Sequence, residues 1–158
     1  MNIILEEIFS GLPDGPEMAR LVTRLLTAMI LGAVIGAQRE SLHKPAGLRT
    51  HMLVAMGAAL FVLAPLESGM ELDGLSRVIQ GIVTGIGFIG AGAILKLRKK
   101  REIEGLTTAA GVWMTAAVGI AAGLGRLGLA FVSTVLTWIT LSIIGKIERW
   151  MNDERKEA

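Results

Sequence analysis

Gly85, Gly87 and Gly90 have the G-x-G-x-x-G spacing that binds the pyrophosphate of a dinucleotide cofactor in Rossmann folds. That chemistry needs a strand before the glycines, a helix after them and an acidic residue about 20 positions later. In this chain the glycines lie in the middle of an uncharged apolar stretch, with no turn beside them to bound a strand. The hydrocarbon core of a membrane excludes the lipid-exposed loop that such a site would require. We therefore predict no cofactor here.

Glycines four positions apart, by contrast, form a flat strip on which another membrane helix can pack closely. We predict that six glycines with this spacing, distributed over three apolar stretches, are helix-packing positions. They are Gly32 and Gly36, Gly81 and Gly85, and Gly119 and Gly123.

A second group of residues could bind an anion, because basic side chains stand beside threonines at predicted helix starts. Threonine oxygens cap free N–H groups there, and the positive ends of helix dipoles attract anions. The ligand would be a phosphate, a lipid headgroup or a partner's carboxylate; the alternative is ordinary capping beside basic loops. We also expect an Arg–Glu pair across this loop, and a hydrogen-bonded His51 that is not a ligand. The group comprises Arg39, Glu40, Lys44, Arg49, Thr50, His51, Thr107 and Thr108.

Carboxylates that could bind a metal ion or line a cation path are missing from the apolar stretches, since all 14 acidic residues lie outside them. Mg²⁺ prefers oxygen ligands, usually one or two carboxylates. The loop ESGMELDGLSR, residues 67–77, either binds a divalent ion weakly or carries only solvated charge. The sequence has no arrangement of nucleophile, base and orienting group. We therefore predict no metal site and no enzymatic activity.

The elements that position these residues are predicted to be membrane-spanning helices. A soluble domain has about 45–50% apolar residues with glycine included, whereas this chain has 52% without its 20 glycines. Its mean hydropathy is +0.58. An apolar run of about 17–25 residues with few charges can span a bilayer. Four uncharged runs qualify, at residues 50–66, 78–95, 105–125 and 127–145, and a fifth run covers 21–37.

The fifth run, residues 21–37, contains one charge, Arg24, one turn from its start. Arginine near the end of a span can extend its long stem to the headgroups, so we expect Arg24 to reach the membrane surface. The fold class is therefore an all-α integral membrane protein with about five transmembrane helices.

The basic residues predict the orientation of these helices. Twelve of the 16 lysines and arginines fall in the loops after the first and third spans and in the C-terminal segment. The positive-inside rule places those segments in the cytoplasm and the N-terminus outside. We predict an extracytoplasmic segment at 1–20, a membrane domain at 21–145 and a cytoplasmic tail at 146–158. The basic loop Lys96–Arg101 could bind anionic lipid, while a net charge of +2 is too small to indicate nucleic acid.

Two segments of the chain resemble each other, GLRTHMLVAMGAAL from Gly47 and GLTTAAGVWMTAAV from Gly105, and seven of their 14 positions match. Each copy would contain two spans joined by a basic loop, so the copies would have the same orientation, as in a parallel repeat. The alternative is that small-residue membrane helices look alike. The shared G-L-x-T start favours a repeat followed by an unpaired fifth helix.

The chain resembles the MgtC/SapB family of bacterial inner-membrane proteins over about Arg20 to Gly125. Four stretches carry the resemblance: GAVIGAQRE, KPAGLRTHMLVAMGAALF, GIGFIGAGAI and GLTTAAGVWMTAAVGIAAGLG. The resemblance implies about five spans and a multi-pass location in the inner membrane. It places functional weight on Arg39 and Glu40, on Pro45 to His51 and on Gly105 to Thr108. Longer members add an ACT-like C-terminal domain, so this chain would be a short form.

The family is associated with growth in low magnesium and survival of intracellular pathogens, which leads to two functional hypotheses. The first is a regulatory protein that adapts the cell to magnesium limitation or stress through contacts with itself or with other membrane proteins. The glycine strips and the uncharged spans favour this hypothesis. The second is a small permease or channel for an ion or an anionic solute such as magnesium or phosphate, which the repeat favours.

Overall fold

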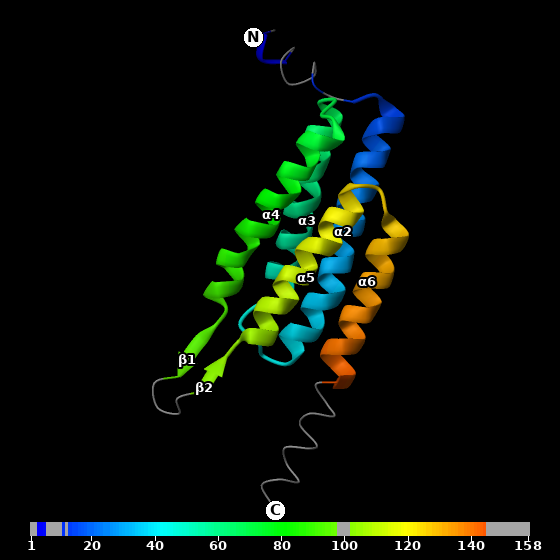
Figure 1. Cartoon of the computed structure of the whole chain (residues 1–158). Helices are drawn as coiled ribbons and strands as arrows, with labels where there is room; N and C mark the ends of the chain where they lie inside the picture. The colour runs from blue at the N-terminus through cyan, green and yellow to red at the C-terminus, as the bar shows by residue number, and fades with distance from the viewer. Residues whose placement is uncertain (1–2, 6–10, 12, 98–101, 145–158) are drawn as a thin grey trace, which may run out of the picture.

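The computed structural model describes residues 3–5, 11, 13–97 and 102–144. The predicted tail at 146–158 and residues 98–101 of the predicted lipid-binding loop lie outside the described residues. The elements form an up-and-down bundle (Figure 1). In chain order they are α2 (Gly15–Ser41), α3 (Leu48–Glu67), α4 (Leu72–Gly92), β1 (Leu95–Leu97), β2 (Glu102–Glu104), α5 (Leu106–Gly123), α6 (Leu127–Ile139) and a π-helical turn η1 (Thr140–Ile144).

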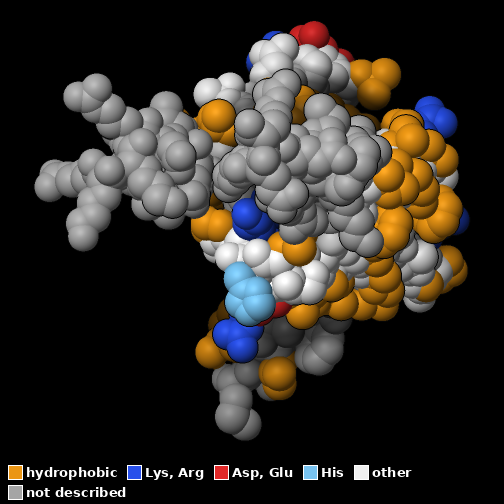
Figure 2. All heavy atoms as spheres, turned by 90° about the horizontal axis from the view of Figure 1, so that it is seen from below, with side chains coloured by type: hydrophobic (Ala, Val, Ile, Leu, Met, Phe, Trp, Pro, Cys, Tyr) orange, Lys and Arg blue, Asp and Glu red, His pale blue; other side chains and the backbone are white. Residues whose placement is uncertain are grey.

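Four of the helices, α2 to α5, are long and apolar enough to cross a membrane, and α6 with η1 adds a shorter apolar helix. Large hydrophobic side chains are exposed along the bundle, among them Phe61, Phe88 and Phe131. Seen from its lower end, the molecule carries a broad band of hydrophobic side chains along one side (Figure 2). Since exposed apolar surface of this extent suits lipid and not water, the chain is an all-α multi-pass membrane protein, as predicted. Its orientation stays a prediction.

Several helix boundaries differ from the sequence prediction; α4, for example, begins at Leu72 and not at Val78. α2 begins at Gly15 because the Asp14 carboxylate accepts a 3.1 Å hydrogen bond from the Glu17 N–H, which caps the helix. Residues 15–20, predicted as an extracytoplasmic segment, therefore belong to the first helix. α4 ends at Gly92 and not near Leu95, because Leu95 pairs with Glu104 in a short antiparallel hairpin, β1–β2.

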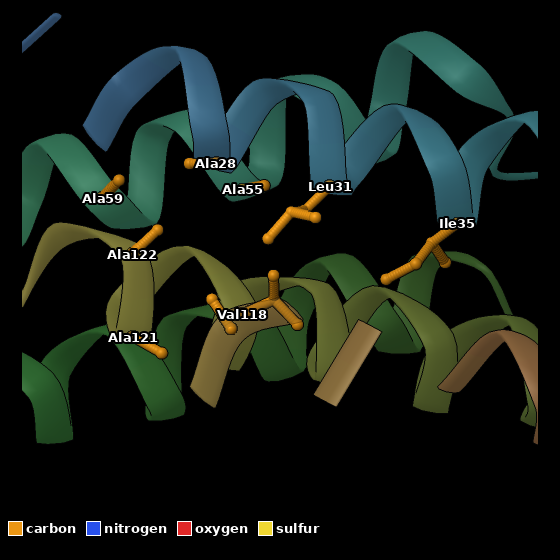
Figure 3. Close-up of a cluster of buried hydrophobic side chains, with 9 residues drawn as sticks. Ala28, Leu31, Ile35, Ala55, Ala59, Val118, Ala121 and Ala122 are labelled. Atoms are coloured by element: carbon orange, nitrogen blue, oxygen red, sulfur yellow. The ribbon is translucent and has the colours of Figure 1, made fainter. Parts of the chain in front are cut away.

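α5 is the central helix, since it contacts α2, α3, α4 and α6. The core around α5 is built from small residues: the largest buried cluster contains six alanines beside Leu31, Ile35 and Val118. Figure 3 shows Leu31 and Ile35 of α2 pointing toward α5. Small side chains let helix backbones approach closely and gain dispersion energy, which drives helix association in lipid.

Arg24, expected to reach the membrane surface, has a specific partner at the end of α5. Its guanidinium donates a 3.2 Å hydrogen bond to the Gly123 carbonyl in the last turn of α5. The chain then turns through Gly125, which has a positive φ of 74°. The Gly125 and Arg126 N–H groups bond back to Ala122 and Ala121, so only the Gly123 carbonyl is left for the arginine. Arg24 thus complements the negative end of α5.

The two predicted repeat units have equivalent contacts. α3 starts after Gly47 and α5 after Gly105, the same pair of glycines that begins the repeated sequence. In the first hairpin, a Cβ added to Gly32 would lie 2.6 Å from the His51 carbonyl oxygen. In the second, a Cβ added to Gly90 would lie 3.6 Å from the Ala109 Cβ. The same positions meet in both hairpins, but α4 packs more loosely on α5 than α2 packs on α3.

Candidate functional site

Arg39, in the last turn of α2, turns into the bundle and not toward the loop. Its side chain is 3% exposed, and its guanidinium donates a 2.6 Å hydrogen bond to the Thr108 hydroxyl on α5. Among the described residues the only ion pair joins Arg77 and Asp73, both exposed, so the predicted Arg–Glu pair is not found. The negative end of α2 offsets at most about 2 kcal/mol for Arg39, while burying a charge costs several kcal/mol.

His51, in the first turn of α3, is fully buried and lies 2.7 Å from the Thr115 hydroxyl through its Nδ1. The Thr115 hydroxyl itself donates to the Gly111 carbonyl at 2.9 Å. Because that proton is directed to Gly111, we infer that His51 Nδ1 carries the ring hydrogen and donates it to Thr115. The other ring nitrogen, Nε2, is buried and has no hydrogen-bond partner among the described residues.

The two contacts lie on one face of α5. Thr108, Gly111 and Thr115 are three and four positions apart, so they follow one another along the same side of the helix. The His51 ring lies against Gly111, since a Cβ added there would be 3.7 Å from its Cε1. Arg39 of α2 and His51 of α3 thus both reach the same polar face of the central helix. We call Arg39, His51, Thr108 and Thr115 the buried polar cluster.

Thr115 was missed by the sequence analysis. The hydroxyls predicted to matter were those at the starts of helices, whereas Thr115 lies in the middle of α5. The spacing of Thr108 and Thr115, two turns apart on an apolar helix with a glycine between them, was the signal that could have found it.

Glu40 performs the capping that the threonines were predicted to perform. Its carboxylate accepts a 2.7 Å hydrogen bond from the Leu48 N–H at the start of α3. It also lies against Gly47, where a Cβ would collide with the carboxylate. The N-cap residues of α3 and α5 are Gly47 and Gly105, so the predicted threonine caps are wrong: Thr108 is the third residue of its helix and is buried.

The remaining residues of the predicted cluster lie outside the buried polar cluster. Lys44, Arg49 and Thr107 are exposed and Thr50 is half-buried. Figure 2, the view from this end of the molecule, shows basic side chains and a histidine on the surface. The sequence-predicted group thus divides into a buried part and an exposed basic rim.

Four of the six predicted packing glycines lie in close helix contacts on both sides of α3. Cβ atoms added to Gly32 and Gly36 of α2 would lie within 3 Å of α3 backbone atoms. Gly119 and Gly123 of α5 lie against the backbone at Ala55 and Ala59 in the same way. α3 is therefore held between two glycine strips.

Gly81 and Gly85 differ from the other four, because no atom lies within 4 Å of a Cβ added to either. The helix contact predicted for them is not made within the described chain, since α4 leans away from α3. They line an open apolar groove of about 530 Å³ instead. The groove is formed by Leu53, Val54, Gly57, Ala58 and Phe61 of α3, Val78, Gly81, Ile82, Gly85, Ile86 and Ile89 of α4, and Ala116 of α5.

Within the described residues, no three histidine, aspartate or glutamate side chains are grouped so that they could hold a metal ion. In the loop that could have bound a divalent ion weakly, the Asp73 carboxylate accepts a 3.0 Å bond from Arg77 instead.

Comparison with known proteins identifies the family. Residues 25–150 match the MgtC family. The chain is 42% identical to Protein SrpB of Synechococcus elongatus, over 94% of this chain and 84% of SrpB. It is 44% identical to Protein MgtC of Salmonella typhimurium, over 73% of this chain and 48% of that protein. It is 42% identical to "Putative magnesium transporter YhiD" of Escherichia coli K12, over 85% of this chain and 65% of that protein.

The chain spans about half the length of the MgtC proteins that it matches. No solved structure matches it. The family match covers most of the five-helix bundle, including Arg39, His51, Thr108 and Thr115. The chain therefore belongs to the MgtC family.

Proposed function

We propose that this chain is a bacterial inner-membrane protein that serves adaptation to magnesium limitation, and that it is a regulator and not an enzyme. It would act through helix contacts, either with a second copy of itself or with another membrane protein. The names of two relatives, Protein MgtC of Salmonella and "Putative magnesium transporter YhiD" of Escherichia coli, support the link to magnesium.

The observation that carries the regulatory role is the groove between α3 and α4. The other two glycine strips each hold a helix of this chain, whereas Gly81 and Gly85 face open space. Glycines separated by one turn let a helix backbone approach within packing distance. A groove of about 530 Å³ lined only by apolar side chains and glycines suits an apolar helix. It offers an ion none of the polar groups that conduction through lipid requires.

The test is to fill the groove without disturbing the fold. Gly81→Leu and Gly85→Leu place side chains in the open space, while Gly87→Leu is the matched control, because Gly87 also has nothing within 4 Å but does not line the groove. The variants are expressed in a bacterium that lacks its own member of the family and is grown in limiting magnesium. We expect wild type and Gly87→Leu to support growth and the groove variants to fail, at equal membrane levels. Equal growth of all four would contradict the proposal.

The alternative function is a small permease or channel for an ion or an anionic solute. The buried polar cluster favours it, since polar groups inside a membrane domain often mark a solute path. Purified protein in proteoliposomes distinguishes the two functions. Saturable, protein-dependent flux of magnesium or phosphate, lost in Thr115→Val, would establish transport; no flux above empty liposomes is expected for a regulator.

A further inference from the structure

Unpaired polar atoms gather at one end of the bundle. Within the described residues, buried side-chain nitrogens or oxygens without a hydrogen-bond partner belong to Gln38, Arg39, His51 and Ser142. The first two are in the last turns of α2, His51 is in the first turn of α3, and Ser142 is in η1. These segments all lie at the lower end in Figure 1. Buried polar groups are almost always paired, so exceptions indicate a bound ligand, ion or water.

The buried charge of Arg39 has no counterion among the described residues. Arg39 is always protonated, is 3% exposed and has no carboxylate partner among the described residues. The neighbouring carboxylate, Glu40, is committed to the Leu48 N–H. A buried cation without a counterion is unfavourable, and an anionic ligand would supply the missing charge.

The hydrogen-bonding groups around Arg39 indicate which kind of anion would bind. Thr108 accepts from Arg39, and in the first turn of α5 its own hydroxyl hydrogen can be donated to a ligand oxygen. α3 and α5 both begin at this end, so the positive ends of both helices lie there, although Glu40 already pairs with the Leu48 N–H of α3. His51 Nε2, by contrast, is an acceptor, because Nδ1 carries the ring hydrogen. The site therefore combines donors for a negative oxygen with one acceptor for a hydroxyl.

We propose that Arg39, His51 and Thr108 form a binding site for a phosphate group that carries or adjoins a hydroxyl. Arg39 pairs with the negative oxygens, Thr108 donates to one of them, and His51 Nε2 accepts the hydroxyl hydrogen. Two sources have this chemistry: inorganic hydrogenphosphate and the headgroup of phosphatidylglycerol. The inference stands on the buried polar cluster alone and does not rest on the proposed regulatory role.

The test uses the full chain in nanodiscs of phosphatidylcholine. Inorganic phosphate is titrated against sodium chloride of matched ionic strength, and a second set of nanodiscs contains phosphatidylglycerol. Apparent Tm and calorimetric affinity are the readouts, because a ligand that binds the folded state raises its stability. A response to phosphate identifies the free ion, and a response to phosphatidylglycerol alone identifies the headgroup; either result supports the site.

The variants separate the site from surface charge. Arg39→Gln is expected to weaken binding by at least about tenfold, since a charge-assisted hydrogen bond is lost. Arg49→Gln removes an exposed arginine at the same end and is the matched control, expected to bind as wild type does. No response of wild type to either probe, or an equal loss in the two variants, would overturn the proposal. If Arg39→Gln does not fold, the affinity of Thr108→Val for the same probes is measured instead. Unchanged affinity would overturn the proposed site, and weaker binding would support it.

Discussion

Gly119 of α5 lies directly against the backbone carbonyl of Ala55 on α3, and the contact leaves no room for a side chain at Gly119. Gly119→Ala is therefore expected to destabilise the protein, because overpacking of a close helix contact costs about 1–3 kcal/mol. Gly85→Ala is the matched control, since nothing lies within 4 Å of that position.

The two substitutions should have opposite signs. Alanine is favoured over glycine inside a helix by about 1 kcal/mol, so Gly85→Ala is expected to raise the apparent Tm in detergent while Gly119→Ala lowers it. Thermal unfolding followed by size-exclusion chromatography measures both. A decrease of similar size for the two variants would show that α4 packs on another helix at Gly85.

The fold could be predicted from the sequence because lipid permits few alternatives. A long uncharged run must form a spanning helix to pair its own backbone groups. The ends of α3 and α5 therefore lie within two residues of the predicted runs, while α4 begins six residues before its run. The boundaries were less predictable, since they depend on local contacts. The Asp14 carboxylate extends α2 to Gly15, and the pairing of Leu95 with Glu104 ends α4 early.

Glu40 is predicted to stabilise the start of α3 through its bond to the Leu48 N–H, at 2.7 Å. Glu40→Ala removes this cap and is expected to cost about 1 kcal/mol. Glu40→Gln keeps an acceptor oxygen and should cost less. Hydrogen exchange measured by mass spectrometry on peptides that cover the start of α3 tests the effect. Unchanged exchange in Glu40→Ala would mean that the carboxylate does not cap the helix.

The first helix hairpin, α2–α3, is packed more closely than the second, α4–α5, and this difference leads to a further prediction. Gly32→Ala is expected to lower the apparent Tm, because a Cβ there would lie 2.6 Å from the His51 carbonyl oxygen. Gly90→Ala, at the equivalent position of the second hairpin, meets Ala109 at an ordinary distance of 3.6 Å and should be tolerated. Equal destabilisation would show that the second hairpin is packed as tightly as the first.

The candidate site was only partly predictable, because sequence shows which residues are near a helix end but not which way they face. Thr107 and Thr108 are adjacent, yet a helix turns about 100° per residue. Thr108 therefore meets Arg39 in the core, while Thr107 is exposed. The same uncertainty affected Gly81 and Gly85. Their spacing predicted a packing strip. Only the structure, in which α4 is tilted away from α3, shows that the strip faces an open groove.

The bond between His51 and Thr115 gives the last prediction. Thr115→Val keeps the shape of the side chain and removes the acceptor for the His51 Nδ1–H, at 2.7 Å. Because His51 is fully buried, both ring nitrogens would then lack a protein partner, at an expected cost of about 1–3 kcal/mol. Thr84→Val is the matched control, since Thr84 is exposed and bonds only to the Gln80 carbonyl of its own helix.

The measurement is the apparent Tm of the two valine variants and of Thr115→Ser, which keeps the hydroxyl. We expect Thr115→Val to be the least stable, Thr115→Ser to lose only the small contribution of one buried methyl group, about 1 kcal/mol, and Thr84→Val to resemble wild type. If Thr115→Val were as stable as Thr84→Val, the histidine would have to find another partner. In that case the orientation of its ring, and with it the assignment of Nε2 as the free acceptor, would be wrong.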